Sequence, residues 1–247
     1  MRAAPTLATL LAALLATSPG FAEEADPKAD FVADNLVAIF YHELGHALID
    51  QLELPVLGKE EDAADILSVL LIDDVWEPEI AQEIVVNNAI AYAMRAEAGA
   101  EDDPGFWDVH GHDLQRYYTH VCLFYGADPE QREEFALAAD LPEERAAGCP
   151  EERQLAEDSW WTYLQPLADQ APGTALALNA AEDEFTADVI GDEITALNER
   201  FDLPKAVTVD VTECGEINAY YVPAESRIIM CTEFSEFLWQ QAEAAEL

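Results

Sequence analysis

Residues 42–65 read HELGHALIDQLELPVLGKEEDAAD, and this stretch decides the fold because it contains the facing ends of two helices and the turn between them. Apolar residues recur at three- and four-residue spacing over 30–52, which predicts a helix buried along a broad face, with Asp30 as its N-cap. Leu54-Pro55 ends that helix, because a residue before proline avoids the α region. A second helix is predicted over 59–75 and folds back against the first.

Two histidines of the first helix are placed to bind one metal ion. His42 and His46 are four residues apart, so both imidazoles project from one helix face and can reach a single zinc ion. Glu43 lies beside them and is predicted to act as the general base that takes a proton from the attacking water. Two histidines and a glutamate inside an apolar helix need a partner, and a metal ion supplies one.

The third ligand is expected at the start of the second helix. Glu61 and Asp65 are four residues apart and share a face, which suits one ligating carboxylate and one carboxylate that holds a histidine's other nitrogen. Glu61 is therefore the first choice as ligand. Glu60 ranks second, because it lies about 100° around the helix and should point elsewhere, and Asp62 ranks third. The alternative is an acidic helix start that complements the helix dipole.

A second histidine cluster lies at Asp108-Val109-His110-Gly111-His112-Asp113. His110 is a candidate catalytic residue that donates a hydrogen bond to the oxyanion of a tetrahedral intermediate. The cluster is equally consistent with a surface loop that collects a cation, or with a helix cap formed by Asp108 or Asp113.

The rest of the chain predicts a mostly helical α+β protein. Turn signals occur at 102–105, 169–174 and 223–226, where Pro and Gly or small polar residues interrupt the apolar pattern. Runs rich in Val, Ile and Tyr in the C-terminal third predict strands of a small antiparallel sheet. The expected helices are 79–98, 113–125, 151–168, 181–200 and 233–245, and the expected strands are 206–212, 217–222 and 227–232.

The N-terminus resembles a secretory signal. Arg2 precedes an apolar run over 6–16, and Gly20-Phe21-Ala22 offers a cleavage site, so residues 1–22 are expected to be removed. Residues 23–170 are then expected to form a helical metal-binding region, and 171–247 an α+β region that completes the same catalytic domain. No other run is long and apolar enough for a membrane span.

Composition and cysteines agree with export to the periplasm or medium. The 247 residues include 51 Asp or Glu and only 11 Lys or Arg, a net charge of −40, which excludes nucleic acid as a partner because binding phosphates takes clustered basic residues. Four cysteines without a C-x-x-C pair indicate disulfides in an oxidising compartment. Of the three possible connectivities, the local one is expected, with Cys122 bound to Cys149 and Cys214 to Cys231.

These motifs carry a resemblance to known metallopeptidases. The pair His42-Glu-x-x-His46 and Glu61-x-x-x-Asp65 resembles the Glu-zincins, in which the second Glu is the third zinc ligand. The stretches 42–65, 110–129 (HGHDLQRYYTHVCLFYGADP) and 214–234 (CGEINAYYVPAESRIIMCTEF) are similar to a bacterial family of exported proteins that are classed as metallopeptidases and whose function is unknown. The resemblance implies that His42, His46 and Glu61 are metal ligands and that Glu43 is the general base.

The order of these stretches differs from the pattern of that family. There the Cys-Gly hairpin precedes the HExxH helix, whereas here 214–231 follows it by about 170 residues, so the chain looks circularly permuted. A zincin fold needs a sheet beside the metal-binding helix, and only a few residues separate the signal from this helix. The sheet is therefore expected from the C-terminal third, with Asp30 and the last helix near Trp239 close together.

The sequence thus predicts an exported zinc peptidase whose partner is a peptide or protein substrate. The alternative is a non-catalytic, metal-stabilised binding or envelope protein with a vestigial HExxH site. In that case a fourth protein ligand, Asp62 or His110, would close the coordination sphere.

Overall fold

The computed structural model describes residues 26–98 and 107–246. The predicted signal peptide at 1–22 and the predicted turn at 102–105 lie outside the described residues. Within them, no helix is long and apolar enough to cross a bilayer.

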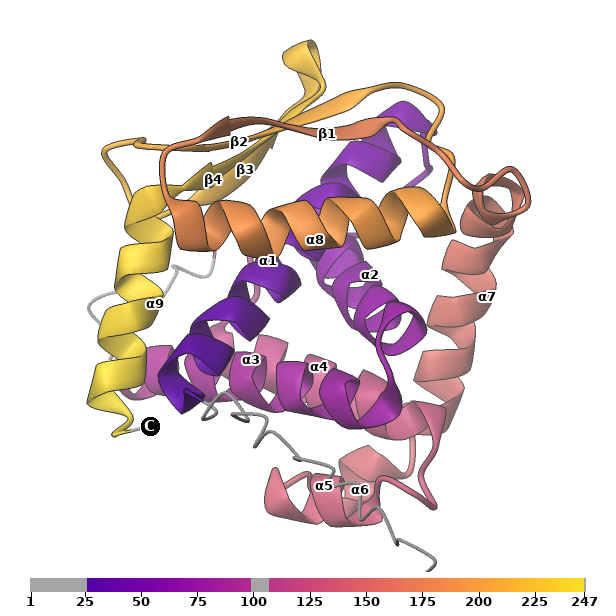
Figure 1. The fold of residues 1–247 in the computed structure, drawn as a ribbon. Helices are drawn as coiled ribbons and strands as arrows, with labels where there is room; N and C mark the ends of the chain where they lie inside the picture. Colours follow the sequence, from indigo (N-terminus) through magenta and orange to yellow (C-terminus); the bar gives the residue numbers. More distant parts are fainter. Residues whose placement is uncertain (1–25, 99–106, 247) are drawn as a thin grey trace, which may run out of the picture.

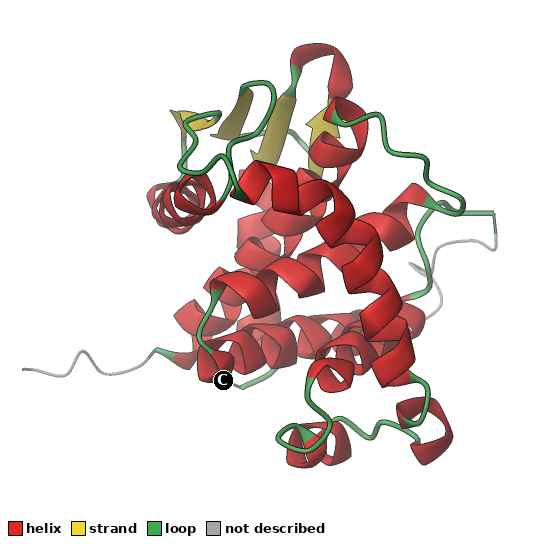
Figure 2. Ribbon diagram, turned by 90° about the vertical axis from the view of Figure 1, so that its right-hand side faces the viewer, coloured by secondary structure: helices red, strands yellow, loops and turns green. Residues whose placement is uncertain are grey.

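Helices make up most of the described chain, and a small sheet lies at one end of them (Figures 1 and 2). The fold is therefore the mostly helical α+β class that the sequence predicts. The helices are α1 (Pro27–Gln51), α2 (Glu60–Val75), α3 (Pro78–Ala98), α4 (Asp113–Ala127), α5 (Glu133–Ala138), α6 (Glu143–Ala146), α7 (Cys149–Ala168), α8 (Glu184–Arg200) and α9 (Thr232–Ala244), and the strands are β1 (Leu176–Ala181), β2 (Val207–Thr212), β3 (Ala219–Val222) and β4 (Arg227–Cys231).

Helix α1 is the centre of the core. Sixteen of its 25 residues are buried, which is typical of a helix enclosed on most sides rather than along one stripe. It packs against α2, α3, α8, α9, β3 and β4. The helix starts earlier than predicted, because the side chain of Asp26, not Asp30, accepts hydrogen bonds from the backbone N–H groups of Lys28 and Ala29.

The sheet has the strand order β1-β2-β4-β3. The predicted hairpin of β3 and β4 is antiparallel, but β1 with β2 and β2 with β4 are parallel pairs, so the sheet is mixed rather than antiparallel throughout. Strand β1 was not predicted, since its sequence LALNAA lacks the β-branched residues that mark strands. The helix expected over 181–200 consequently starts later, where the Asp183 side chain accepts from the Thr186 N–H.

The turn between β3 and β4 is more structured than a plain hairpin loop. A 3-10 turn over Pro223–Glu225 is followed by Ser226 in the left-handed region, with φ of 47°. Two short helices, α5 and α6, were also not predicted, because segments of six and four residues are too short to show a periodic pattern.

The C-terminal third supplies the sheet beside α1, as expected for a zincin-like arrangement. Strands β3 and β4 pack on α1, and α8 connects β1 to β2 and also packs on α1. Helix α9 packs along α1, so the start and the end of the described chain lie side by side, as circular permutation requires (Figure 1). The permutation itself stays a prediction.

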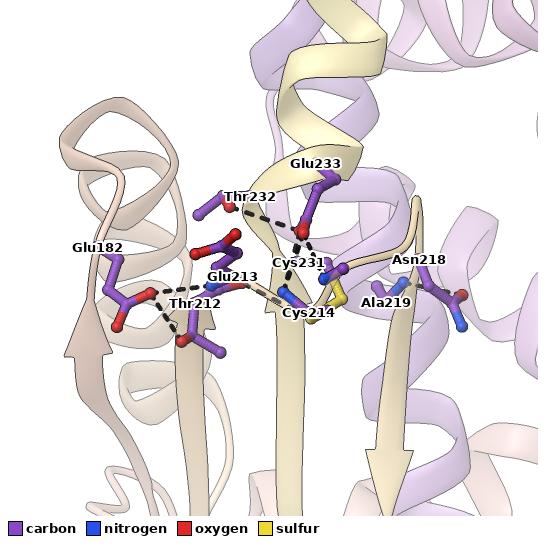
Figure 3. The surroundings of a disulfide bond; sticks show 10 residues. Glu182, Thr212, Glu213, Cys214, Asn218, Ala219, Cys231, Thr232 and Glu233 are labelled. Carbon is purple, nitrogen blue, oxygen red and sulfur yellow. Dashed lines mark hydrogen bonds between the residues drawn. A yellow bond between two sulfur atoms is a disulfide. The ribbon is translucent and has the colours of Figure 1, made fainter.

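Both predicted disulfides are present. Cys122 is bound to Cys149, which joins α4 to the start of α7, and Cys214 is bound to Cys231, which joins the loop before β3 to the end of β4. Glu233 strengthens the second connection, since its carboxylate accepts a hydrogen bond from the backbone N–H group of Cys214 (Figure 3) and another from that of Gly215. The loop that leads into β3 is therefore held by a disulfide bond and by the hydrogen bonds of Glu233.

A buried carboxyl group connects α8 to α1. The hydroxyl of Tyr41 donates a hydrogen bond to Oε2 of Glu193, and both side chains are buried. Burial raises the pKa of Glu193 from its ordinary 4.5 to about 7. The folded chain therefore holds a proton on this carboxyl group more tightly than the unfolded chain does.

This difference makes stability depend on pH. The contribution of Glu193 is complete below pH 4.5 and is lost as the pH rises through 7, at a cost of about 3 kcal/mol. We expect Glu193→Gln, which keeps an acceptor for Tyr41, to unfold at higher denaturant than the wild type at pH 8 and to lose this advantage at pH 4.5. Denaturant titrations at both pH values measure this, and an equal difference at the two values would contradict it.

Candidate metal centre and active site

A close contact between α1 and α2 sets the position of the candidate site. A Cβ atom on Gly45 would lie 3.0 Å from the Cα of Ala64 and 3.1 Å from its Cβ, so the two helices touch at these residues. Gly45 lies between His42 and His46 in the sequence, and Ala64 lies next to Asp65. The small residues therefore bring the histidines of α1 against the acidic first turns of α2.

Three side-chain atoms converge at this contact. Nε2 of His42 and Nε2 of His46 are 3.2 Å apart, and Oε2 of Glu61 lies 3.2 Å from the first and 3.3 Å from the second. Ligand atoms about 2.0–2.1 Å from a tetrahedral zinc ion lie about 3.3 Å from one another. The spacing of the three atoms therefore matches that of three ligands on one zinc ion.

The hydrogen bonds of the other ring nitrogens fix the tautomers. Nδ1 of His42 lies 2.8 Å from Oδ1 of Asp65, and Nδ1 of His46 lies 2.8 Å from Oε1 of Glu60. A carboxylate only accepts, so each Nδ1 carries the proton, and in a neutral imidazole each Nε2 then presents a lone pair. Three such atoms facing one point need positive charge between them, which either protons on the imidazoles or a metal ion can supply.

The sequence led us to expect Glu60 to point away from the histidines, but its side chain faces His46. Its carboxylate bonds His46, although its side chain is half exposed. The angle of about 100° between Glu60 and Glu61 describes only the directions of their Cβ atoms. The glutamate side chain has enough rotatable bonds to reach His46 from the first residue of α2. Both histidines therefore have a carboxylate on Nδ1, one from Asp65 and one from Glu60.

Arg116 on α4 holds Asp65 in place. Its Nε donates to Oδ2 at 2.8 Å and its Nη2 to Oδ1 at 2.6 Å, a two-point contact that fixes the plane of the carboxylate. Asp65 is buried and Arg116 is partly buried, and Arg116 also lies over the ring of Tyr92 at 4.7 Å. Despite its burial, the guanidinium and His42 hold the pKa of Asp65 far below its usual range, so it stays ionised.

The charges of the site favour a bound cation. Burial lowers the pKa of His42, but the hydrogen bonds of Asp65 and Glu61 outweigh this and raise it to about 9. Burial raises the pKa of Glu61, but the hydrogen bonds of the neighbouring histidines outweigh this effect and hold the pKa well below its ordinary value. The surrounding carboxylates raise the pKa of both His42 and His46, so they favour positive charge at this point, and a divalent metal ion would provide such charge.

Glu43 lies next to the three converging atoms and is 4% exposed. Burial raises its pKa above the ordinary range, and the positive charge of the two histidines opposes the rise. The backbone of Tyr221 on the edge strand β3 also lowers the pKa of Glu43. A carboxylate in this setting is a stronger base than one in water, which suits a proton acceptor.

His110 contacts the same oxygen of Glu61 that faces the two other histidines. Its Nε2 is 3.1 Å from Oε2 of Glu61, and its Nδ1 is 3.1 Å from Oδ1 of Asp108. Lys59 secures the loop by donating to the backbone carbonyls of Asp108 and His110 at 3.1 and 3.0 Å. The hydrogen bond of Glu61 raises the pKa of His110, because each ring nitrogen faces a carboxylate.

Neither predicted cap of α4 is used. The N-cap is His112, whose N–H donates to Oε1 of Gln115, while Asp108 accepts from the N–H of His110. Asp62 is exposed. Among the described residues, the group whose ligand atoms all lie within 4.8 Å of one another at this site comprises His42, His46 and Glu61, without Asp62 or His110.

A cleft of about 740 Å³ opens beside His42 and Glu43. It runs along α1 between α3 and α9, and Asn218 and Ala219 at the start of β3 form part of its wall. The disulfide and Glu233 fix the loop that carries these two residues (Figure 3). His42 and Glu43 therefore line a cavity large enough for part of a peptide.

The comparison with protein families agrees with this arrangement. The model of the DUF4344 family, described as "Putative metallopeptidase", matches residues 14–164 and 178–246. The chain belongs to this family. No curated protein and no solved structure matches it. The matched ranges of the DUF4344 model include all three stretches on which the resemblance was based, and with them the HExxH helix, His110 and the hairpin.

Several contacts in this DUF4344 protein were not anticipated from the sequence. Candidate site residues form hydrogen bonds with Arg116, Lys59 and Glu60. The sequence did not reveal these contacts, because charged side chains are also typical of an exposed helix face. The proximity of Gly45 to Ala64 had a signal, because small residues on both helices allow a close crossing. The roles of His42, His46, Glu61, Asp65, Glu43 and His110 remain predictions.

The contact of the two helices gives a test of the site geometry. We expect Gly45→Ala to weaken zinc affinity by about ten- to a hundredfold, because the new methyl group would displace Ala64 and with it the carboxylates of α2. Competition with a chromogenic chelator measures the affinity.

Gly191 of α8 offers the matched control. A Cβ there would have no atom within 4 Å. Gly191→Ala should leave zinc affinity unchanged and stabilise the fold by about 0.5–1 kcal/mol through helix propensity. Equal affinities of Gly45→Ala and the wild type would contradict the account.

Proposed function

We propose that this protein is an exported zinc-dependent peptidase. The observation that carries the proposal is the convergence of Nε2 of His42, Nε2 of His46 and Oε2 of Glu61 at 3.2–3.3 Å from one another. Membership of a family described as metallopeptidases supports it. Two disulfides support export, because such bonds persist in oxidising compartments.

In this proposal His42, His46 and Glu61 hold the metal ion. When bound, zinc supplies Lewis-acid polarisation of the scissile carbonyl and makes water more acidic. Glu43 takes the proton of the attacking water and later passes it to the leaving amine. Asp65 and Glu60 keep the two imidazoles in the tautomer whose Nε2 faces the site.

His110 is proposed to stabilise the developing oxyanion. Its two carboxylate partners raise its pKa and so favour the protonated form, in which Nε2 carries an N–H group beside the candidate ligands. Lys59 fixes the loop that presents it. A preorganised donor at this position lowers the barrier because it needs no reorganisation when charge develops.

The arrangement favours a catalytic site over a structural one. Structural zinc sites are closed by four protein ligands, whereas catalytic sites have three and leave a position for water or substrate. The described group at this site has three members, and His42 lines the cleft. Both points support the peptidase over a binding protein that uses the same metal only for stability.

Removal of the proposed base tests the catalytic role. We expect Glu43→Gln to lower the rate of peptide hydrolysis by about a hundred- to ten-thousandfold while zinc content and thermal stability are retained. Cleavage of a peptide library, read by mass spectrometry, gives the activity, and the exposed Glu199→Gln on α8 is the control. Full activity of Glu43→Gln would remove the assigned base.

A second substitution separates the oxyanion role of His110 from that of a fourth ligand. We expect His110→Ala to lower kcat by about a hundred- to a thousandfold while the chain still binds one zinc ion, because the three proposed ligands remain and the lost oxyanion donor acts on the transition state. If the variant loses zinc instead, His110 is a metal ligand, and this result would favour the alternative of a non-catalytic protein with a structural metal site.

A further inference from the structure

Two arginines line the cleft beside the candidate active site, Arg95 from α3 and Arg116 from α4. Both guanidinium groups pack on the ring of Tyr92, which follows the same cleft wall. The Cζ atom of Arg95 lies 4.5 Å from the ring centroid and that of Arg116 lies 4.7 Å from it. Two of the 11 basic residues of the chain therefore gather at one aromatic ring in the wall of this cleft.

Arg95 has donors that the protein does not use. Its Nε donates to Oδ1 of Asp113 at 3.2 Å. Within the part of the chain that the structure describes, neither Nη atom has a hydrogen-bond partner, and neither is among the buried side-chain atoms that lack one. Solvent therefore reaches both Nη atoms, in agreement with a side chain that is 26% exposed. The N–H groups of Nη1 and Nη2 are open to a ligand in the cleft.

Arg116 adds a further donor close to the candidate metal position. Its Nε and Nη2 bind Asp65, and Oδ1 of Asp65 lies 2.8 Å from Nδ1 of His42. Its Nη1 has no partner among the described residues and, like the Nη atoms of Arg95, is not one of the buried atoms without a partner. One side chain, Asp65, thus separates this guanidinium group from a candidate zinc ligand.

The unused donors suit a carboxylate. A guanidinium group presents its N–H groups in a planar fork that matches the two oxygens of a carboxylate, and such charged hydrogen bonds are about twice as strong as neutral ones. Asp113 bonds only Nε of Arg95, so the fork of the two Nη atoms is left for a second acceptor. A ligand carboxylate in the cleft can therefore bind Arg95 without displacing Asp113.

A peptide has carboxylates at its C-terminus and on Asp and Glu side chains, and the charge of the protein favours the first. The net charge of −40 repels a peptide that is itself rich in acidic residues. The C-terminal carboxylate brings a single negative charge and is present in a peptide of any sequence. We therefore expect the two arginines to recognise the end of a chain rather than an acidic side chain.

We propose that Arg95, with Arg116 beside it, binds the C-terminal carboxylate of the substrate, so that the enzyme is a carboxypeptidase. The inference rests on the proposed peptidase function, since it names the substrate class of the same site. Hydrolysis adds one water molecule across the scissile bond, which gives the released fragment a new amino group and the remaining peptide a new C-terminal carboxylate. The shortened peptide carries the recognised group again, so the peptide is trimmed stepwise from its C-terminus.

Peptides that differ only at the C-terminus test the proposal. Each Ser/Ala-rich peptide is made as the free acid, as the C-terminal amide, and as an amide whose last residue is Glu. We expect the zinc-loaded enzyme to cleave the free acid with kcat/KM about 10- to 100-fold above that for either amide, because the charged hydrogen bonds are lost. Mass spectrometry should show a ladder of products shortened from the C-terminus.

Two results would overturn the proposal in this assay. Equal cleavage of the free acid and the plain amide would show that no carboxylate is recognised. Cleavage of the Glu amide as fast as the free acid would assign the arginines to an acidic side chain instead of the C-terminus.

Substitutions of arginine locate the selectivity. Arg95→Met removes the donors at similar length and should lower the ratio of kcat/KM for free acid and amide about tenfold, mainly through KM. Arg95→Lys keeps the charge without the fork and should give an intermediate ratio. Arg200→Met is the matched control, because Arg200 on α8 also pairs with an aspartate, Asp74, and should keep the ratio within twofold. An unchanged ratio in Arg95→Met would overturn the assignment.

A binding measurement separates the carboxylate site from the peptidase. The zinc-loaded Glu43→Gln variant is titrated with free-acid and amide peptides that carry a dye at the N-terminus, and fluorescence anisotropy should show about tenfold tighter binding of the free acid. Adding Arg95→Met should remove this difference, whereas a carboxylate bound by zinc alone would keep it and refute the role of Arg95.

The two proposals can fail separately. Cleavage of free acid and amide at equal rates, or equal affinity for both, refutes the carboxylate site and leaves the peptidase intact. Preferential binding of the free acid that depends on Arg95, without cleavage by the wild type, refutes the peptidase and leaves the carboxylate site intact.

Discussion

The structure depends on one electrostatic constraint, which is that two imidazole nitrogens and a carboxylate oxygen face the same point inside the protein. Asp65 and Glu60 fix the protons of His42 and His46 on the far side of each ring, so the near sides present lone pairs. Such an arrangement is unfavourable without a cation and favourable with one. The proposed metal ion would therefore stabilise the folded state.

The surrounding fold supplies the support that this constraint needs. The contact of Gly45 with Ala64 sets the distance between α1 and α2, and Arg116 holds Asp65 from α4. The sheet also packs on α1, where the backbone of Tyr221 lowers the pKa of Glu43. The chain has 51 acidic and only 11 basic residues, and one of these few basic residues, Arg116, is bonded to a carboxylate of the candidate site.

Much of this was predictable from the sequence, and the misses have physical reasons. Helical spacing placed His42, His46 and Glu61 on facing helices, and the four-residue interval identified Asp65, because these inferences need only local periodicity. Strand β1 was missed because an alanine-rich edge strand is specified by its pairing with β2 and not by its own residues. The contact of Glu60 with His46 was missed because side-chain rotamers, unlike Cβ directions, are not set by periodicity.

The central claim is that the folded chain requires a metal ion at the three converging atoms. The most direct test is to purify the mature protein without chelators, determine its metal content, and record its melting temperature before and after treatment with a chelator. Because a metal ion that binds only the folded form raises stability by mass action, the account predicts about one zinc ion per chain and a melting temperature that falls by several degrees on chelation. A metal-free protein whose melting temperature is the same with chelator and with added zinc would contradict it.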